Sequence, residues 1–435
     1  MSIPDEGFNT IDAWHARLRE SAETCARRFI SVRDSLPADI RKALFAVELS
    51  DAEIRDSFEY ARANYARPLS GVPYFLKDNF DVRGLPTFAG SSFLGKVRGI
   101  PTVPCRLYET LHSLGAVFAG KTQMTEFAAD LSGENSISGN CPNPLDPSRL
   151  SGGSSSGSAA AVGAGLVPMA FGTDTAGSVR VPAAFCGVFG LRIQPGPLSR
   201  EGVFPWAPSF DAAGWFTGSA ADMATLCTEL GYGSPRSKEP PKPVLWCGEL
   251  FESPDAELNE SYSYLAQCLG AVSDPEACEL LRPHISNAVR AFDVLRDAES
   301  YEKQKALLAS FANSYSPKLR ARLEAAGRRT PKEIEQAKRE AADLAAALHE
   351  VFSDYDVLAW PITPSVAPKM DHYTPGLRQA LLSMNVPVSL ARLPALALPA
   401  ITGSGLSGGI QCVFPSEVRM DVPNLLRNAG YFEQT

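Results

Sequence analysis

The stretch from Leu150 to Ile193 constrains this chain more than any other segment of its sequence. It combines two turns rich in glycine and serine with an apolar run whose side chains are nearly all small. An acidic and a basic residue, Asp174 and Arg180, stand among those small residues. Glycine lets a backbone approach a ligand closely, and functional residues are concentrated on loops that a rigid scaffold positions. We therefore interpret this stretch as an active site.

Phosphate binding is the first function to test for a glycine-rich turn that precedes a helix. A phosphate-binding loop of the nucleotide-hydrolase type requires a lysine after its second glycine, whereas Gly157 is followed by Ser158 and Ala159. A dinucleotide-binding turn requires a third glycine, whereas Gly165 is followed by Leu166. Both phosphate motifs lack a required residue, so the hydroxyl groups of the stretch need another explanation.

The overall charge argues against nucleic acid or an anionic membrane surface as a partner. The 435 residues carry a net charge of −8, with 21% charged residues and no basic cluster. The first residues form no apolar signal region, and no stretch approaches the roughly 20 apolar residues that cross a bilayer. We expect a cytoplasmic protein that acts on a small neutral or polar molecule.

The cysteines and histidines give no sign of a metal site or a disulfide framework. Nine cysteines are dispersed without CxxC spacing, and the five histidines lie far from one another. An odd, scattered set of cysteines is typical of reduced thiols packed in a core. We predict that the protein needs no metal and no cofactor.

Apolar spacing predicts helices that alternate with short buried strands. Residues 1–66 are expected to be a helical layer, and residues 240–355 a variable, mostly helical region. A proline-rich connection from Pro240 should lead into a strand before Cys247. Thr330-Pro331-Lys332-Glu333 is a capping box with proline at the first helical position, so a helix should begin there. Another helix is expected over 102–114, a long loop over 132–149, and strands at 71–76, 116–120, 356–360, 395–398 and 409–414.

These strands come from both halves of the chain, which makes one continuous sheet more economical than two independent domains. We predict an α/β fold, in which a single large domain over residues 1–435 has a mixed, mostly central β-sheet covered by helices on both faces. Residues 68–222 should form the core of this domain, and residues 356–435 should return to the sheet.

A serine hydroxyl needs a base before it can act as a nucleophile. Ser154, Ser155 and Ser156 lie in the first turn and Thr173, Thr175 and Ser178 in the second, yet no histidine occurs between His112 and His284 and no GxSxG motif surrounds a serine.

Lys77 is an alternative base, because it follows the buried strand 71–76 directly. Burial disfavours the ammonium form and lowers a lysine pKa. A simple salt bridge of Lys77 with Asp78 or another carboxylate is the competing interpretation, and these residues alone favour it.

Three segments resemble the amidase signature family of serine hydrolases. The first two are Gly152-Gly-Ser-Ser-Ser-Gly-Ser-Ala-Ala-Ala161 and Gly172-Thr-Asp-Thr-Ala-Gly-Ser-Val-Arg-Val-Pro-Ala-Ala-Phe-Cys-Gly187. The third, Gly71-Val-Pro-Tyr-Phe-Leu-Lys-Asp-Asn79, is similar to the lysine motif of that family. The likeness extends from about Pro68 to Asp222 and is weaker over 356–414.

The resemblance implies a role for each catalytic position. Ser178 would be the nucleophile, Ser154 a bridging serine on a cis peptide bond, and Lys77 the base that acts through it. The oxyanion hole would consist of the backbone N–H groups of Thr175, Ala176, Gly177 and Ser178. Ser155 would support the first turn, Asp174 and Arg180 would be a buried pair that braces the second turn, and the loop from Asp130 to Gly133 would face the substrate.

The implied activity is hydrolysis of the C–N bond of a small carboxamide or urea-derived amide through an acyl-enzyme. Two related activities stay open. A glutamine-hydrolysing subunit of a tRNA-dependent amidotransferase would typically have glutamine where this chain has Val181. An allophanate-type hydrolase is suggested by Ala176, where many members have glycine, but no residues in 255–355 match the carboxylate-binding residues of that group.

A non-catalytic binding or assembly protein on the same scaffold is the third alternative, and the presence of all three catalytic positions argues against it. The family often forms dimers, which leaves a homodimer open.

Overall fold

The computed structural model describes residues 7–232 and 242–431. Within that part of the chain, ten strands form one sheet in the order β1-β3-β2-β4-β6-β5-β9-β10-β8-β7. The strands are β1 (Phe45–Glu48), β2 (Pro73–Lys77), β3 (Val117–Thr122), β4 (Met169–Asp174), β5 (Phe189–Arg192), β6 (Ala212–Thr217), β7 (Val244–Trp246), β8 (Val357–Pro361), β9 (Ala395–Ile401) and β10 (Ser407–Val413). Strands from both halves of the chain share the sheet, as predicted.

The sheet is mixed, and its central strands run parallel where the two motifs meet. β2 pairs in parallel with β3 on one side and with β4 on the other. Leu76 of β2 lies opposite Phe171 of β4, so the carboxyl ends of these strands meet at the same edge. This register brings Lys77 beside Thr173, the residue before Asp174. β4 continues antiparallel into β6, and the sheet then passes through β5 to the C-terminal strands.

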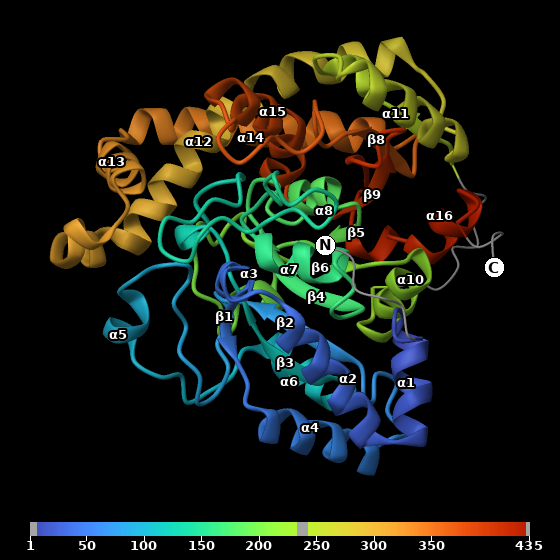
Figure 1. Cartoon of the computed structure of the whole chain (residues 1–435). Helices are drawn as coiled ribbons and strands as arrows, with labels where there is room; N and C mark the ends of the chain where they lie inside the picture. The colour runs from blue at the N-terminus through green and yellow to red at the C-terminus, as the bar shows by residue number, and fades with distance from the viewer. Residues whose placement is uncertain (1–6, 233–241, 432–435) are drawn as a thin grey trace.

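Helices cover the sheet in layers (Figure 1). N-terminal helices lie below it in that view, most helices of the second half lie above it, and the C-terminal helix lies to its right. The helices of the first half are α1 (Ile11–Glu20), α2 (Ala22–Ser35), α3 (Ala38–Leu44), α4 (Asp51–Ala63), α5 (Leu94–Arg98), α6 (Arg106–Ser113), α7 (Ser156–Gly163), α8 (Arg180–Cys186), α9 (Pro197–Arg200) and α10 (Ala220–Glu229). Those of the second half are α11 (Ala256–Cys268), α12 (Pro275–Phe311), α13 (Pro317–Ala326), α14 (Pro331–Val351), α15 (Pro375–Leu390) and α16 (Val422–Asn428). The predicted α/β fold with one mixed sheet is confirmed.

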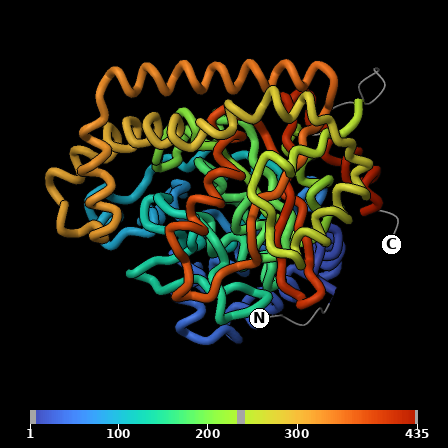
Figure 2. The backbone as a smooth tube through the Cα atoms, turned by 90° about the horizontal axis from the view of Figure 1, so that it is seen from above, coloured from blue at the N-terminus to red at the C-terminus, as the bar shows by residue number. Residues whose placement is uncertain are grey.

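Two long helices, α12 and α14, lie side by side along one edge of the molecule (Figure 2). α14 begins at the predicted capping box, in which the Thr330 hydroxyl accepts the Glu333 N–H and the Glu333 carboxylate accepts the Thr330 N–H. α12 also packs against α13 and α15. The mostly helical region 240–355 therefore contacts the body of the protein through α12, and also through α11, which packs against β9 and β10.

The N-terminal region differs from the prediction, because residues 1–66 are not wholly helical. Residues Phe45–Glu48 form β1, which pairs antiparallel with β3 at the edge of the sheet. A four-residue strand is too short to show an alternating pattern, so its pairing partner decides its conformation. The helix expected over 102–114 covers only Arg106–Ser113, and Val103 before it is 67% exposed. The predicted connection at Pro240 lies outside the described residues, although β7 follows it as expected.

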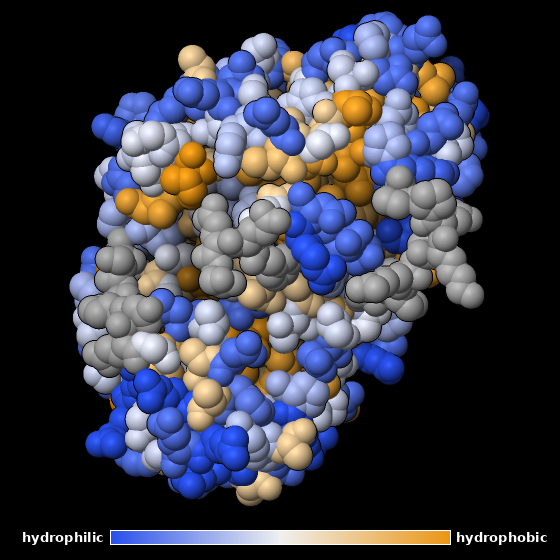
Figure 3. All heavy atoms as spheres, turned by 90° about the vertical axis from the view of Figure 1, so that its right-hand side faces the viewer, coloured by the Kyte–Doolittle hydropathy of each residue, from blue (hydrophilic) through white to orange (hydrophobic). Residues whose placement is uncertain are grey.

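The described residues contain neither a cluster of side chains that could hold a metal ion nor a helix long and apolar enough to cross a membrane. All nine cysteines are free thiols, and eight of them are buried. One face of the molecule, shown in Figure 3, is mostly hydrophilic, with apolar residues gathered in recesses.

Candidate active site

Lys77 and Ser154 meet in the interior, at the end of β2. The Lys77 Nζ donates to Ser154 Oγ at 2.7 Å and to Thr173 Oγ1 at 2.9 Å, and all of Lys77 is buried. Asp78 instead pairs with Lys121, whose Nζ lies 2.6 Å from Asp78 Oδ1. Among the described residues Lys77 forms no salt bridge with Asp78 or another carboxylate, so the competing interpretation is wrong.

Burial lowers the pKa of Lys77 to about 7, because the apolar strand removes water from the ammonium group. The carboxylates of Asp174 and Asp211 oppose this shift without cancelling it. A pKa near 7 leaves a large share of the amine neutral at physiological pH, and a neutral amine can accept a proton.

The Ser154 turn is held by backbone contacts on both of its sides. The Gly153–Ser154 peptide bond is cis. The Gly153 N–H donates to the Leu131 carbonyl at 2.8 Å, and the Ser154 carbonyl accepts the Thr125 N–H at 3.3 Å. Gly133 has φ +85°, and a Cβ there would lie 2.5 Å from the Gly152 carbonyl oxygen. The loop around Gly133 is therefore packed directly against the Ser154 turn.

Ser155 joins the first turn to the second. Its N–H donates to the Ser178 carbonyl at 3.2 Å, and its Oγ donates to the Thr173 carbonyl, also at 3.2 Å. The same Oγ accepts the Thr173 N–H at 3.3 Å. These bonds fix the spacing of the Ser154 turn from the strand end that leads to Ser178.

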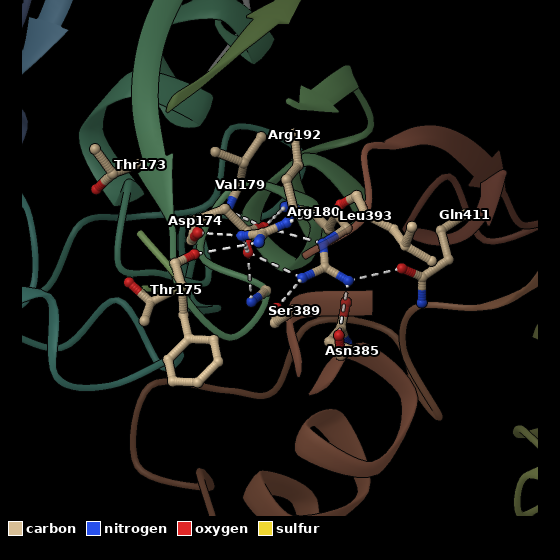
Figure 4. Close-up of polar contacts among 12 residues, drawn as sticks. Thr173, Asp174, Thr175, Val179, Arg180, Arg192, Asn385, Ser389, Leu393 and Gln411 are labelled. Carbon is tan, nitrogen blue, oxygen red and sulfur yellow. Dashed lines mark hydrogen bonds and ion pairs between the residues drawn. The ribbon is translucent and has the colours of Figure 1, made fainter. Parts of the chain in front are cut away.

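Asp174 is the centre of a buried charge network below the second turn (Figure 4). Its carboxylate contacts Arg180 Nη2 at 2.9 Å and Arg192 Nη1 at 3.0 Å, and all three side chains are buried. Burial by itself would raise the pKa of Asp174, but the two arginines and the backbone donors hold that pKa well below its usual value. The predicted Asp174–Arg180 pair is present in this network, and Arg192 is an additional partner that the motifs did not indicate.

Every N–H donor of the Arg180 guanidinium has an acceptor within the protein. Its remaining N–H groups donate to the carbonyl oxygen of Asn385, to Gln411 Oε1 and to Ser389 Oγ at 2.9, 2.8 and 2.8 Å. These partners belong to α15 and β10, so the C-terminal part of the chain holds the Ser178 turn in place. Figure 4 shows Asn385, Ser389 and Gln411 around the Arg180 guanidinium.

The four backbone N–H groups assigned to the oxyanion hole are not equivalent. Gly177 donates its N–H to Asp174 Oδ1 at 2.9 Å, so this donor is already engaged. Within the described part of the chain, the N–H groups of Thr175, Ala176 and Ser178 donate to no protein acceptor. Those three donors remain available to an oxyanion.

A small pocket of about 20 Å³ reaches Ser178, and a chamber of about 760 Å³ adjoins it. Both cavities share Asp130, whereas Gly133 lines neither. Asp130 lies 2.6 Å from Lys318 Nζ and accepts a hydrogen bond from the Tyr373 hydroxyl at 3.3 Å. The loop thus contributes Asp130 to the cavities and Gly133 to the packing of the Ser154 turn.

Three arginines from the second half of the chain complete the pocket beside Ser178. They are Arg296 on α12, Arg322 on α13 and Arg378 on α15. No motif marks them, because each stands in an ordinary amphipathic helix far along the chain from the serines. The sequence offered no signal for them.

The chain was compared with models of known protein families, and the match includes the three motifs. The family model described as Amidase matches residues 20–263 and 272–416. The chain belongs to the amidase signature family. Its sheet and flanking helices are accordingly the amidase signature fold, shared with solved structures that align over nearly its whole length.

The similar proteins of this family carry names that refer to different activities. A glutamyl-tRNA(Gln) amidotransferase subunit from a Synechococcus species is 31% identical over 479 residues, spanning 98% of this chain and 96% of that relative. Allophanate hydrolase of Kluyveromyces lactis aligns with a TM-score of 0.83 and 25% identity over 97% of this chain and 72% of that one. A structure described as a vestigial protein complex that reveals the origins of an s-triazine catabolic enzyme gives 0.82 and 26%, with 97% of each chain covered.

Proposed function

We propose that this member of the amidase signature family hydrolyses the C–N bond of a small carboxamide or urea-derived amide, releasing a carboxylate and ammonia or an amine. The observation that carries the proposal is the buried Lys77 amine, 2.7 Å from Ser154 Oγ and with its pKa lowered to about 7. A buried lysine that forms no salt bridge within the described part of the chain is poised to exchange protons with the hydroxyl it contacts.

The proposed reaction begins when Ser178 Oγ attacks the amide carbonyl carbon. Its proton passes to Ser154 Oγ as Ser154 gives its own proton to Lys77 Nζ. The proton then returns along the same groups to the leaving nitrogen as the C–N bond breaks. Water repeats the sequence on the acyl-enzyme, and the carboxylate is released with Ser178 restored.

We assign stabilisation of the oxyanion to the backbone N–H groups of Thr175, Ala176 and Ser178. Preorganised donors of this kind are worth most in a site that excludes water. Gly177 has a different role, because its N–H donates to Asp174 and so links the turn to the charge network below it.

A second candidate function is the glutamine-hydrolysing subunit of a tRNA-dependent amidotransferase, which the 31% identity to a subunit of that kind supports. Val181 stands where glutamine is typical of that group, and this departure argues for the independent amidase. The two functions differ in their need for partners. Cytoplasmic location and a homodimer stay predictions under either function.

The experiment is to assay the purified chain alone for ammonia release from aliphatic, aryl, urea-derived and malonamate-like amides, with Ser178→Ala as the control. Turnover by the lone chain and labelling of Ser178 by a fluorophosphonate probe are expected. Labelling without turnover of any amide by the lone chain would favour the amidotransferase function. If neither labelling nor turnover is observed, the result would favour the non-catalytic binding protein.

A further inference from the structure

A short helix, α13 (Pro317–Ala326), forms one wall of the outer chamber. It packs against α12, and Figure 1 shows it at the left edge of the molecule beside that helix. A 3-10 turn (Ala312–Ser314) separates it from α12, and Gly327 follows its last residue. The residues of α13 that line the chamber are Lys318, Leu319, Arg322 and Ala325. A short helix that packs mainly on one neighbour, with a break at each end, can open locally at low cost.

Two polar contacts join the start of α13 to the catalytic half of the chain. The Ser316 N–H donates to both carboxylate oxygens of Glu126, at 3.3 and 3.2 Å. Lys318 Nζ lies 2.6 Å from Asp130 Oδ2. Both acceptors belong to the segment 126–130, which lies between α13 and the Ser154 turn. We call these two contacts the latch.

The segment that the latch holds has an unfavourable backbone. Phe127 and Ala128 have φ values of +50° and +61°, in the left-handed region that residues with a Cβ rarely adopt. Such a conformation persists only where its surroundings hold it. From the side of α13, the Tyr315 ring stacks with Phe127 at 5.2 Å between centroids, and Arg322 Nη1 donates to the Ala129 carbonyl. The region around α13 therefore helps to maintain this backbone.

The same segment is bonded at its ends to the turn that carries Ser154. The Leu131 carbonyl accepts the Gly153 N–H at 2.8 Å, and the Ser154 carbonyl accepts the Thr125 N–H at 3.3 Å. The Thr125 hydroxyl donates to the Asp130 carbonyl at 3.2 Å, which ties the two ends of the segment together. A shift of the segment is therefore transmitted to the turn.

We propose that α13 is a movable wall of the chamber, and that its latch to residues 126–130 holds the Ser154 turn in its reactive position. Ser316 and Lys318 are then positioning residues, because they act on the proton relay through that segment. Opening of the latch widens the chamber for substrate entry, and closure restores the 2.7 Å contact between Lys77 Nζ and Ser154 Oγ. This inference rests on the proposed amide hydrolysis, in which Ser154 relays the proton.

Ser316→Pro removes the N–H of the latch with little other change to the backbone. Ser316 has φ −58°, the value of proline, and Tyr315 before it has φ −77° and ψ 151°, which a following proline permits. We expect kcat to fall about 10-fold, the usual effect of losing a hydrogen bond to a charged group. Ser316→Ala is the matched variant, because it keeps this N–H, and it should lose less than about 3-fold. A Ser316→Pro variant no slower than Ser316→Ala overturns the proposal.

The pH profile distinguishes positioning from a general loss of folded protein. In the native chain kcat/KM should rise through about pH 7, the pKa of Lys77. A loosened Ser154 turn admits water to the amine, so in Ser316→Pro the inflection is expected to move toward the ordinary lysine pKa of 10.5. Partial unfolding would lower the rate at every pH without moving the inflection. A slow Ser316→Pro variant whose inflection stays at pH 7 contradicts the latch.

Lys318→Gln opens the latch at its second contact. Because the Lys318 side chain is 71% exposed, we expect kcat to fall about 2-fold to 5-fold, the range of an exposed ion pair, and Lys318→Arg should restore most of it. Lys305→Gln on α12 is the control, since Lys305 Nζ also lies 2.6 Å from a carboxylate, that of Glu302, and lines neither cavity. This pair of variants carries the test if Ser316→Pro does not fold, and equal rates in the two overturn the proposal.

Hydrogen exchange tests the coupling without turnover. The N–H groups of Gly153 and Ser155 are both hydrogen-bonded in the Ser154 turn, and the amides of α14 report on global folding. Exchange at Gly153 and Ser155 is expected to be about 10-fold faster in Ser316→Pro than in Ser316→Ala, with α14 unchanged. Equal exchange overturns the coupling even where amides are hydrolysed. Faster exchange in a chain that hydrolyses no amide overturns the catalytic proposal and leaves the coupling.

Discussion

Two groups of arginines flank the Ser178 turn, and they differ in how completely the protein pairs them. Arg180 uses all of its donors within the protein, and with Arg192 it encloses the Asp174 carboxylate. Arg296 pairs with Asp293 and Asp297, yet its buried Nε has no hydrogen-bond partner among the described residues. Arg322 and Arg378 lie 4.0 and 3.6 Å from their nearest carboxylates, Asp297 and Asp130. The first cluster is enclosed and holds the Ser178 turn in one position, whereas the second lines the cavities beside that turn.

The largest effect is expected from breaking the compensated cluster. Asp174→Ala leaves Arg180 and Arg192 buried without their anion, so we predict a loss of about 3–5 kcal/mol in the free energy of unfolding. Urea unfolding followed by circular dichroism measures it. Arg378→Gln is the comparison from the pocket, where the partner is more distant, and should cost less than about 1 kcal/mol. Equal losses in the two variants would remove the distinction between the clusters.

Lys77→Met is expected to lower kcat by roughly 10²- to 10⁴-fold, the usual contribution of a general base. Its effect on stability should be small or favourable, because a buried amine is replaced by an apolar chain of similar length. Amide hydrolysis and thermal unfolding are measured on the same sample. Lys121→Met is the control for burial. It leaves the buried Asp78 carboxylate without its ion-pair partner, so it should destabilise the protein instead.

The pH dependence follows from the Lys77 pKa of about 7. The base must be neutral, so kcat/KM should rise with pH through about 7 and fall roughly tenfold per unit below it. Stability has the same sign, because the unfolded chain binds a proton on this lysine that the folded chain has released between about pH 7 and the ordinary lysine pKa of 10.5. A rate profile in Lys77→Met that keeps the inflection near pH 7 would assign it to another group.

An effect smaller than that of Asp174→Ala is expected where the neutral hydrogen bonds of Ser155 Oγ hold the first turn against Thr173. Ser155→Ala removes the contacts of Ser155 Oγ with both backbone groups of Thr173, so we predict a loss of about 1–2 kcal/mol in unfolding free energy. A drop in kcat should accompany it, because the spacing of the turns loosens. Ser92→Ala on the surface provides the baseline, and a Ser155→Ala variant indistinguishable from it would show that the turns are positioned without this bond.

Local motifs carried most of the information about the catalytic turns. The strand that ends at Lys77 and the glycine-serine turns around Ser154 and Ser178 could be identified because turn residues and apolar runs act over a few positions. The start of α14 was likewise predictable, since a capping box is completed within four residues. The edge strand β1 was not, because its conformation depends on pairing with β3 across the sheet.

The hydrogen bond from the Gly177 N–H to Asp174 is a second feature that the local sequence did not predict. Four consecutive N–H groups look equivalent along the chain, and only the folded turn directs one of them toward Asp174. Arg192 is similar, because it reaches Asp174 from β5, across the antiparallel pair of β5 and β6.

The sequence by itself determined the family, the α/β class and the residues expected to react, since these depend on short segments with strong local constraints. Only the tertiary structure decided that Lys77 contacts Ser154 while Asp78 pairs with Lys121. It also decided that three arginines from α12, α13 and α15 line the pocket at Ser178. The physical reason is that charge compensation is a property of neighbours in space, and these neighbours lie far apart in the chain.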